Sequence, residues 1–197
     1  MRHFAMAIFL GGGLSLAGCG AGDHGDTPDL TTRASTTSPR LPSGIVYMKE
    51  PRDIQVSAPG TAQCHRTTAA DAAIALAATN AARQSRGLAP LRTNPRLQRA
   101  AEAHACEMAR NGMMTHRGRG GTGPSARVKK AGYAPRITAE NIAAGHFDVG
   151  RVQKEWTRSP GHRANIMIGG LQDYGIGRAV AEDGKASYWV AIYGSPK

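Results

Sequence analysis

Apolar residues recur at helical spacing in the middle of the chain. An Ala-rich stretch runs from a capping-box-like pair, Thr68 and Asp71, to a stop at Gly87, which predicts a first helix. A second helix is predicted between Asn94, a cap that is followed by Pro, and Gly112. Its buried face repeats at intervals of three and four residues and comprises Leu97, Ala100, Ala101, His104, Ala105 and Met108.

The later part of the chain changes from helical to strand periodicity. Shorter helices are predicted after Ser125, Asp148 and Ser159, each of which can serve as an N-cap. Two runs with strand character, Tyr174–Ala181 and Ala186–Tyr193, flank an Asp-Gly turn and predict a β-hairpin. Helices followed by an antiparallel pair indicate an α+β fold rather than a parallel doubly wound sheet.

The first eighteen residues have the features of a targeting segment. Arg2 is their only charged residue, and the apolar stretch Phe4–Leu10 is followed by small residues. A basic start, an apolar core and small residues mark a secretory signal peptide, here residues 1–18. The run Leu16-Ala17-Gly18-Cys19 also resembles the bacterial lipobox, which implies a diacylglycerol on the Cys19 thiol and an acyl chain such as palmitate on its amino group. The alternative is an ordinary signal peptide with an incidental cysteine.

Composition divides the remaining chain into a tether and a domain. Residues 19–63 are rich in Gly, Pro, Ser and Thr, so they are expected to form a flexible tether. Two strand-like islands, Gly44–Met48 and Asp53–Ser57, interrupt it and are candidates for crossing the folded domain over residues 64–197. No apolar run reaches the ~20 residues of a spanning helix, so membrane attachment is expected through the lipid. Gly20, after the lipidated Cys, indicates an outer-membrane or periplasm-facing location in a Gram-negative cell.

The chain contains three cysteines. Lipidation of Cys19 would leave Cys64 and Cys106 as a pair in the exported domain. In an oxidising compartment an even count predicts a disulfide. The bridge would close a loop of about 42 residues and stabilise the fold by roughly 3–4 kcal/mol in the chain-entropy treatment. Two buried free thiols are the alternative.

A strong positive charge changes the picture of possible partners. The formal net charge is +11, and removal of residues 1–18 takes away Arg2 alone. A stretch without Asp or Glu, residues 108–139, favours an anionic partner such as lipid headgroups or an envelope polymer. A solvated basic face is the alternative, and nucleic acid is disfavoured by the export signal and the few aromatic residues. The basic residues of the stretch are Arg110, Arg117, Arg119, Arg127, Lys129, Lys130 and Arg136.

Five ordered motifs over about residues 66–194 resemble the CAP superfamily, which comprises cysteine-rich secretory proteins, antigen 5, plant pathogenesis-related proteins and a bacterial SCP-like branch. The resemblance implies an α-β-α sandwich with a three- or four-stranded antiparallel sheet between helices. The motifs are Asn80-Ala81-Ala82-Arg83 with Gly87-Leu88-Ala89-Pro90-Leu91, Leu97-x-x-Ala100-Ala101-x-x-His104-Ala105, Ala139-Glu140-Asn141-Ile142-Ala143, Trp156-x-x-Ser159-Pro160-Gly161-His162-Arg163-x-Asn165-Ile166, and Gly175-Ile176-Gly177 with Tyr188-Trp189-Val190.

The same resemblance indicates a candidate cleft. In the family, two His and two acidic residues line a cleft that binds Zn²⁺ or another divalent cation in some members. Here the corresponding residues are His116, Glu140 and His162, and Ser159 stands where the second acid is often found. Two His and one Glu suit a zinc site with an open position for water, which could hydrolyse an ester, amide or phosphodiester. Without the second acid, we expect weak binding.

Two other interpretations of these residues stay open. The trio can be a structural polar network without catalysis, or Ser159, His162 and Glu140 can form a hydrolase triad. Ser159, Asn141 and Asn165 are expected to support the cleft, the two Asn by satisfying backbone groups.

Three functions remain at this stage. The leading hypothesis is a binding module for lipid or another anionic envelope ligand, without an expected catalytic role. The alternative is a metal-dependent hydrolase acting on peptide, cell-wall or phosphodiester bonds through His116, Glu140 and His162. The third is a structural or interaction protein at the cell surface.

Overall fold

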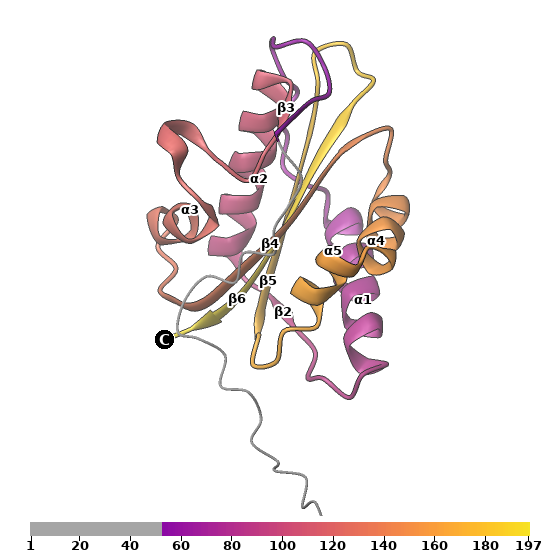
Figure 1. Cartoon of the computed structure of the whole chain (residues 1–197), viewed down its shortest axis with the longest axis vertical. Coiled ribbons are helices and arrows are strands. Elements are labelled where there is room, and N and C mark those ends of the chain that lie inside the picture. Colours follow the sequence, from indigo (N-terminus) through magenta and orange to yellow (C-terminus); the bar gives the residue numbers. More distant parts are fainter. Residues whose placement is uncertain (1–52) are drawn as a thin grey trace, which may run out of the picture. The chain divides into compact units, whose positions relative to one another are not determined.

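The computed structural model describes residues 53–197 (Figure 1). The predicted signal peptide, Cys19, most of the predicted tether and the island Gly44–Met48 lie outside the described residues. Within the described range, no helix is both long enough and apolar enough to cross a membrane. The elements in chain order are β1 (Ile54–Gln55), α1 (Ala69–Gln84), β2 (Arg92–Thr93), α2 (Pro95–Asn111), β3 (Met113–Met114), a 3₁₀ turn (Arg119–Gly121), α3 (Pro124–Lys130), β4 (Pro135–Gly145), α4 (Val149–Arg158), α5 (Pro160–Ile166), β5 (Asp173–Val180) and β6 (Ser187–Pro196).

The central sheet has four strands in the order β2-β5-β6-β4. The predicted hairpin is present as the antiparallel pair β5–β6, and β4 pairs antiparallel with β6 from Pro135 to Gly145. The expected antiparallel sheet is corrected at one edge, because β2 runs parallel to β5. β2 has only two residues between the turn after α1 and the cap of α2, so its pairing is too short to leave a periodic pattern in the sequence.

Helices cover both faces of this sheet, which confirms the α-β-α sandwich (Figure 1). Side chains of a strand alternate between the two faces, and β6 divides its residues accordingly. Trp189, Ala191 and Tyr193 pack in the core under α1, α4 and α5. The intervening residues Tyr188, Val190 and Ile192 pack in the second core, under α2 and α3.

Two glycines of β5 let α2 lie close to the sheet. A Cβ at Gly175 would overlap the backbone at Leu97, and a Cβ at Gly177 would overlap the backbone at Ala101. Both glycines belong to the second face of β5, which packs against the helix. The Gly-Ile-Gly run therefore serves close helix–sheet packing and fixes where α2 lies over the sheet.

Three of the predicted helix starts have the expected cap bonds. The backbone N–H of Asp71 donates to Thr68 Oγ1 at 3.0 Å. Asn94 Oδ1 accepts from the N–H of Arg96 at 3.0 Å, and Asp148 Oδ1 accepts from the N–H of Arg151 at 2.7 Å. These bonds satisfy N–H groups that have no partner within the helix.

Two other predicted caps differ from the expectation. α3 begins at Pro124 with Gly123 as its cap, so the prediction of Ser125 is wrong. A proline at the first position is already suited to a helix start, because it has no N–H to satisfy. Ser159 does occupy the cap position of α5, but its hydroxyl makes no cap bond there.

The segment before α1 lies on the domain. β1 pairs antiparallel with β3, and Gln63 pairs with Val180. The hydroxyls of Ser57 and Tyr188 share a hydrogen bond of 2.9 Å. The strand-like island Asp53–Ser57 contains β1 and lies on the domain, as the sequence indicates, and residues 54–63, which the composition assigns to the tether, are held by these pairings.

The predicted disulfide is confirmed. Cys64 and Cys106 are bonded, with their Cα atoms 5.1 Å apart. The bridge joins the segment before α1 to the middle of α2. It therefore fixes residues 54–64 against the same helix that carries His104.

Candidate functional site

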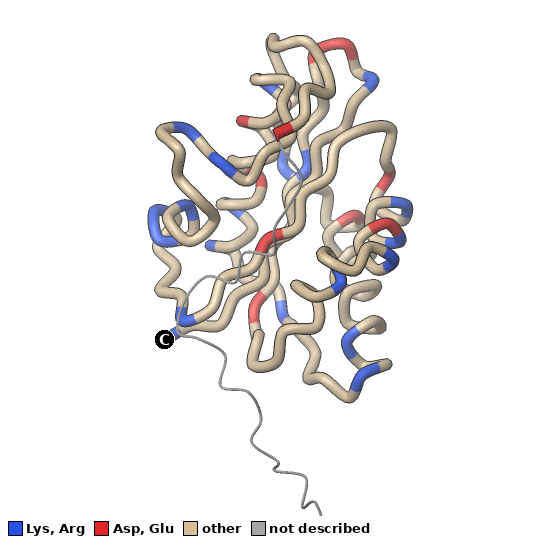
Figure 2. Tube along the Cα trace, in the orientation of Figure 1, with Lys and Arg blue, Asp and Glu red and all other residues tan. Residues whose placement is uncertain are grey.

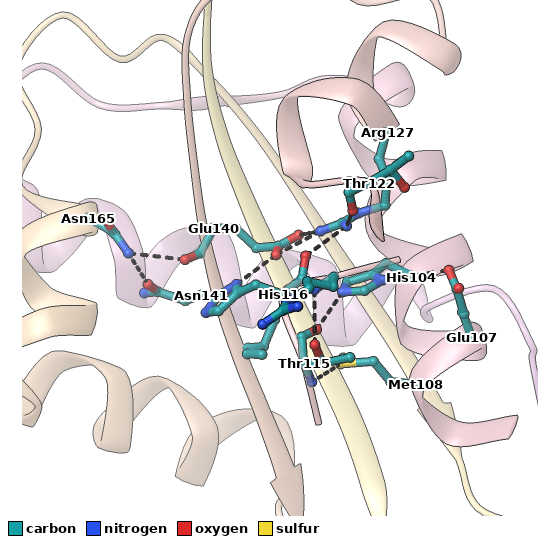
Figure 3. Close-up of polar contacts among 12 residues, drawn as sticks. His104, Glu107, Met108, Thr115, His116, Thr122, Arg127, Glu140, Asn141 and Asn165 are labelled. Atoms are coloured by element: carbon teal, nitrogen blue, oxygen red, sulfur yellow. Dashed lines mark hydrogen bonds and ion pairs between the residues drawn. The ribbon is translucent and has the colours of Figure 1, made fainter. Parts of the chain in front are cut away.

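Glu140 lies near the middle of β4 with its side chain on the α2/α3 face of the sheet. The residue is 4% exposed, and Ile142, two positions along the same strand, belongs to the core on that face. A buried carboxylate requires positive charge and hydrogen-bond donors. Its neighbours come from α2, from the segment after β3 and from α3 (Figure 3).

Arg127 of α3 supplies the strongest contacts of Glu140. Its Nη2 donates to Glu140 Oε1 at 2.8 Å and to Oε2 at 2.6 Å. Its Nη1 donates to the carbonyl oxygens of His116 and Thr122 at 2.9 and 2.8 Å. One guanidinium thus joins α3, β4 and the loop between β3 and α3.

His116 completes the contact with the carboxylate. Its Nδ1 lies 2.8 Å from Glu140 Oε1, and this nitrogen carries the proton that the carboxylate accepts. His116 therefore meets Glu140 as predicted, but as a hydrogen-bond donor to it. Figure 3 shows both residues on the same side of β4, with Arg127 beside them.

His104 holds the backbone next to His116. The residue is fully buried on α2, and its Nε2 donates to the Thr115 carbonyl at 2.8 Å. The N–H of Thr115 in turn contacts Met108 Sδ at 3.4 Å. Burial lowers the pKa of His104, although Glu140 acts in the opposite direction. We call His104, His116, Arg127 and Glu140 the Glu140 cluster.

The cluster keeps Glu140 ionised. Burial alone would raise the pKa of Glu140, but the charges of Arg127 and His104 and the hydrogen bond from His116 lower it to about 2. Opposite charge and donated hydrogen bonds favour the ionised carboxylate. Glu140 is thus ionised at neutral pH, with Arg127 as its counter-ion.

Asn141, the next residue of β4, points to the other face and serves the edge of the sheet. Its Nδ2 donates to the His162 carbonyl at 3.0 Å and lies 3.2 Å from Tyr193 Oη. Asn165 Nδ2 donates to the Glu140 carbonyl at 3.0 Å and to Asn141 Oδ1 at 2.9 Å. The two Asn therefore tie α5 to β4, the edge strand of the sheet.

Trp156 of α4 also binds a carbonyl of the edge strand β4. Its Nε1 donates to the Ile142 carbonyl at 3.2 Å. With Asn165 on the Glu140 carbonyl, two alternate carbonyls of β4 have side-chain partners. The spacing between Trp156 and Asn165 in this motif thus places both side chains on carbonyls of the edge strand β4.

The first motif is structural as well. Asn80 exchanges two hydrogen bonds with the backbone of Leu91, at 2.9 and 2.8 Å. Arg83 is 1% exposed and donates to the carbonyls of Ala89, Ile166 and Ile168. These side chains hold the turn after α1 and the end of α5.

The side chains around Glu140 do not fit a divalent cation. Both oxygens of Glu140 accept from a guanidinium, and Nδ1 of His116 donates to the same carboxylate. Of the predicted trio, the structure brings His116 and Glu140 into contact, while His162 meets Asn141 through its backbone carbonyl. Among residues 53–197 there is no group of three His, Cys, Asp or Glu side chains placed to hold a metal ion.

Sequence reasoning included Arg127 only as one of a run of basic residues and missed its role. A usable signal was its spacing in α3, three residues after Pro124 and one before Val128, both of which are buried, because these positions share one face of a helix. An arginine on the inner side of a helix requires an acid or carbonyl partner. Glu140 was the acid available in a neighbouring buried strand.

Four cations surround the turn at residues 131–132, and we call them the α2/α3 basic surface: Arg96, Arg99, Lys129 and Lys130. All four are exposed. Arg99 Nη2 donates to the Ala131 carbonyl at 3.3 Å, and a Cβ at Gly132 would lie 3.8 Å from Arg96 Nε. Within the described part of the chain, none of the four forms an ion pair. Figure 2 shows α3 with blue positions and no red.

Solved structures share this fold. An outer surface protein from Borrelia burgdorferi is 25% identical and superposes with a TM-score of 0.61 over 66% of this chain and 96% of that one. An extracellular protein with an SCP domain from Bacillus anthracis is 21% identical, with a TM-score of 0.57 over 64% of this chain and 40% of that one.

Sequence comparisons agree with the structural ones. Protein YkwD of Bacillus subtilis, which is uncharacterised, is 32% identical over 127 residues, or 61% of this chain and 49% of that protein. The chain thus spans about half the length of this curated relative. The profile of the cysteine-rich secretory protein family, CAP, matches residues 76–193. The match covers more than half of the chain and includes β4, α4, α5 and the closing hairpin, so the chain belongs to the CAP family of cysteine-rich secretory proteins.

Proposed function

We propose that this chain is an exported, lipid-anchored envelope protein whose CAP domain binds an anionic envelope ligand and is not an enzyme. Export is supported by residues 1–18, by the disulfide between Cys64 and Cys106, and by similarity to an outer surface protein and an extracellular protein. The lipobox-like run before Cys19 supports the anchor.

The α2/α3 basic surface carries the proposal of an anionic ligand. Cations in the last turn of a helix stabilise its negative end, which accounts for Lys129 and Lys130 in α3 without any ligand. Arg96 and Arg99 lie in the first turns of α2, where the helix end is positive and no acid is present. Their position is unfavourable for the helix. The bond to the Ala131 carbonyl accounts in part for Arg99, and binding of an anion is the better explanation of Arg96.

The expected ligand chemistry is a surface of phosphate groups, for which we commit to anionic phospholipid headgroups. Each Lys or Arg near such a surface contributes about 1 kcal/mol, within a Debye length of about 8 Å at physiological salt. A lipid on Cys19 would keep the domain near a membrane. Four cations then suffice for weak, salt-sensitive binding that adds to the anchor.

The alternative, a metal-dependent hydrolase that uses His116, Glu140 and His162, has less support. A metal-bound water needs a ligand set with an open position, and the Glu140 oxygens already accept from Arg127. A triad of Ser159, His162 and Glu140 requires Glu140 to orient the imidazole of His162, whereas the carboxylate is bound to His116 and Arg127.

Vesicle co-sedimentation tests the proposal. The chain from residue 19, with Cys19→Ser to remove the lipid, should bind phosphatidylglycerol vesicles but not phosphatidylcholine vesicles, and salt should weaken binding. Replacing the four cations of the α2/α3 basic surface by Ala should abolish binding. The control removes the same charge from four other exposed positions, Arg86, Lys154, Arg158 and Lys185. Equal loss in both variants would show that net charge alone drives binding and would contradict the assigned surface.

The anchor has its own test. With the natural Cys19, the protein should fractionate with membranes and carry the mass of its lipid. Cys19→Ser should release the protein or leave the signal unprocessed. Membrane retention with an unchanged mass in the variant would refute the anchor and leave the vesicle result untouched.

A further inference from the structure

We infer that Arg127 is a built-in counter-cation that takes the place of a divalent metal ion at Glu140, so that the Glu140 cluster is a metal-independent lock between β4 and the loop of residues 115–122. The inference rests on the cluster alone and is independent of any ligand at the α2/α3 basic surface.

The guanidinium uses its terminal nitrogens fully. Nη2 donates to both oxygens of Glu140, and Nη1 donates to the carbonyls of His116 and Thr122. The side chains of Arg127 and Glu140 are 10% and 1% exposed. A planar guanidinium can donate to a carboxylate and to two backbone carbonyls at once in fixed directions, which a compact ammonium does less well. Arg127 therefore both neutralises Glu140 and fixes the loop.

The loop is shaped around this side chain. The N–H of Gly118 donates to the Thr122 carbonyl at 2.8 Å, which closes a tight turn over Arg127. A Cβ at Gly118 would lie 3.3 Å from Arg127 Nη1 and 3.2 Å from Glu107 Oε2. The absence of a side chain at Gly118 thus leaves room for the guanidinium beneath the turn.

Charge balance explains why a metal ion is excluded. Glu140 contributes one negative charge in a buried position, and Arg127 contributes one positive charge at hydrogen-bond distance. A divalent cation at the same carboxylate would have to displace the guanidinium or stand beside it. Two cations a few ångströms apart in a poorly solvated site repel strongly. Removing Arg127 should reverse this, because Glu140 would then be a buried charge without a counter-ion.

Thermal melting of the folded protein with and without excess ZnCl₂ tests the inference. Zn²⁺ should not shift the melting temperature of the wild type or of Lys129→Met, a control that removes an exposed charge from the same helix. Arg127→Met should melt about 10 °C lower, and Zn²⁺ should recover part of this loss. Arg127→Met with Glu140→Gln should recover stability without Zn²⁺ and lose the response to it. Arg127→Met with His116→Ala should respond less to Zn²⁺.

Calorimetric titration of the wild type with Zn²⁺ gives a second readout that needs no destabilised variant. Zinc binding that Glu140→Gln abolishes would overturn the inference. Binding that Glu140→Gln leaves unchanged lies elsewhere in the chain and agrees with it. An unchanged melting temperature for Arg127→Met, with no response to Zn²⁺, would also overturn it. If Arg127→Met does not fold, Arg127→Lys replaces it, because lysine keeps the charge but cannot make the four hydrogen bonds. This variant should be less stable than the wild type, and Zn²⁺ should not change its melting temperature. A shift of its melting temperature by Zn²⁺ would contradict the inference.

Discussion

Glu140 and Asn141 are adjacent in β4 and act on opposite faces of the sheet. The Glu140 carboxylate accepts from Arg127 and His116 on the α2/α3 face, while Asn141 Nδ2 donates to the His162 carbonyl on the α5 face. Because side chains alternate along a strand, one dipeptide serves two layers of the domain. The motif around residue 140 thus joins the Glu140 cluster to the closure of the β4 edge.

The Glu140 cluster makes the free energy of unfolding depend on pH in the acidic range. The pKa of Glu140 is lowered from 4.5 to about 2 in the fold, so the unfolded chain takes up a proton that the folded chain resists. The contribution of Glu140 is complete above pH 4.5 and is lost as pH falls from there toward 2, by up to about 3 kcal/mol. Urea unfolding over pH 2–6 measures this, and Glu140→Gln should remove that part of the pH dependence. The same dependence in both proteins would contradict it.

His104 adds a second dependence at milder pH. Burial lowers its pKa below the usual 6.5, so the folded chain resists protonation at this residue. The free energy of unfolding should therefore be constant above pH 6.5 and fall as pH decreases below it. His104→Gln keeps a donor for the Thr115 carbonyl but cannot titrate. Its stability should vary less than that of the wild type between pH 6.5 and 5, and an equal slope would show that other groups cause the change.

Asn165 should be sensitive to a change of a single atom. The residue is 3% exposed, and its Nδ2 donates to the Glu140 carbonyl and to Asn141 Oδ1. Asn165→Asp replaces this donor by an acceptor, so the Glu140 carbonyl oxygen and Asn141 Oδ1 would both face the new carboxylate. We expect a loss of about 2–4 kcal/mol in the free energy of unfolding. Asn111→Asp, at an exposed position, is the control and should change it little. Near-equal stabilities would refute the role given to Asn165.

The disulfide should protect the segment before α1. Its loop of 42 residues gives an expected contribution of about 3–4 kcal/mol. Cys64→Ser with Cys106→Ser should lower the melting temperature by about 10 °C. Hydrogen exchange should accelerate most at residues 54–63, which pair with β3 and with Val180. Uniform acceleration across the domain would instead mean that the bridge acts only through the unfolded chain.

The helices and the hairpin could be predicted because their signals are local. Thr68, Asn94 and Asp148 cap the helices that the apolar spacing indicates. β1 lies within the strand-like island Asp53–Ser57, but β2 could not be predicted in this way, because it has two residues and is held by a partner distant in the sequence.

Only two members of the Glu140 cluster could be predicted as site residues, and the chemistry of the cluster could not. The family resemblance indicated His116, Glu140 and His162, and of these His116 and Glu140 meet. Arg127 stands in a run of basic residues, and only its helical spacing from the buried Pro124 and Val128 distinguishes it from Lys129 and Lys130. Its inward position depends on the packing of α3 against β4, a tertiary contact that the local sequence does not contain.

The α2/α3 basic surface is most directly tested by mapping the bound ligand on the domain. Amide chemical shifts should be followed by NMR while the chain from residue 19, with Cys19→Ser, is titrated with soluble short-chain phosphatidylglycerol. The account predicts saturable shifts centred on residues 96–99 and 129–132, which salt suppresses and which phosphatidylcholine does not cause. Shifts centred on α1, α4 and α5, or shifts that phosphatidylcholine reproduces, would contradict an anionic ligand at this surface.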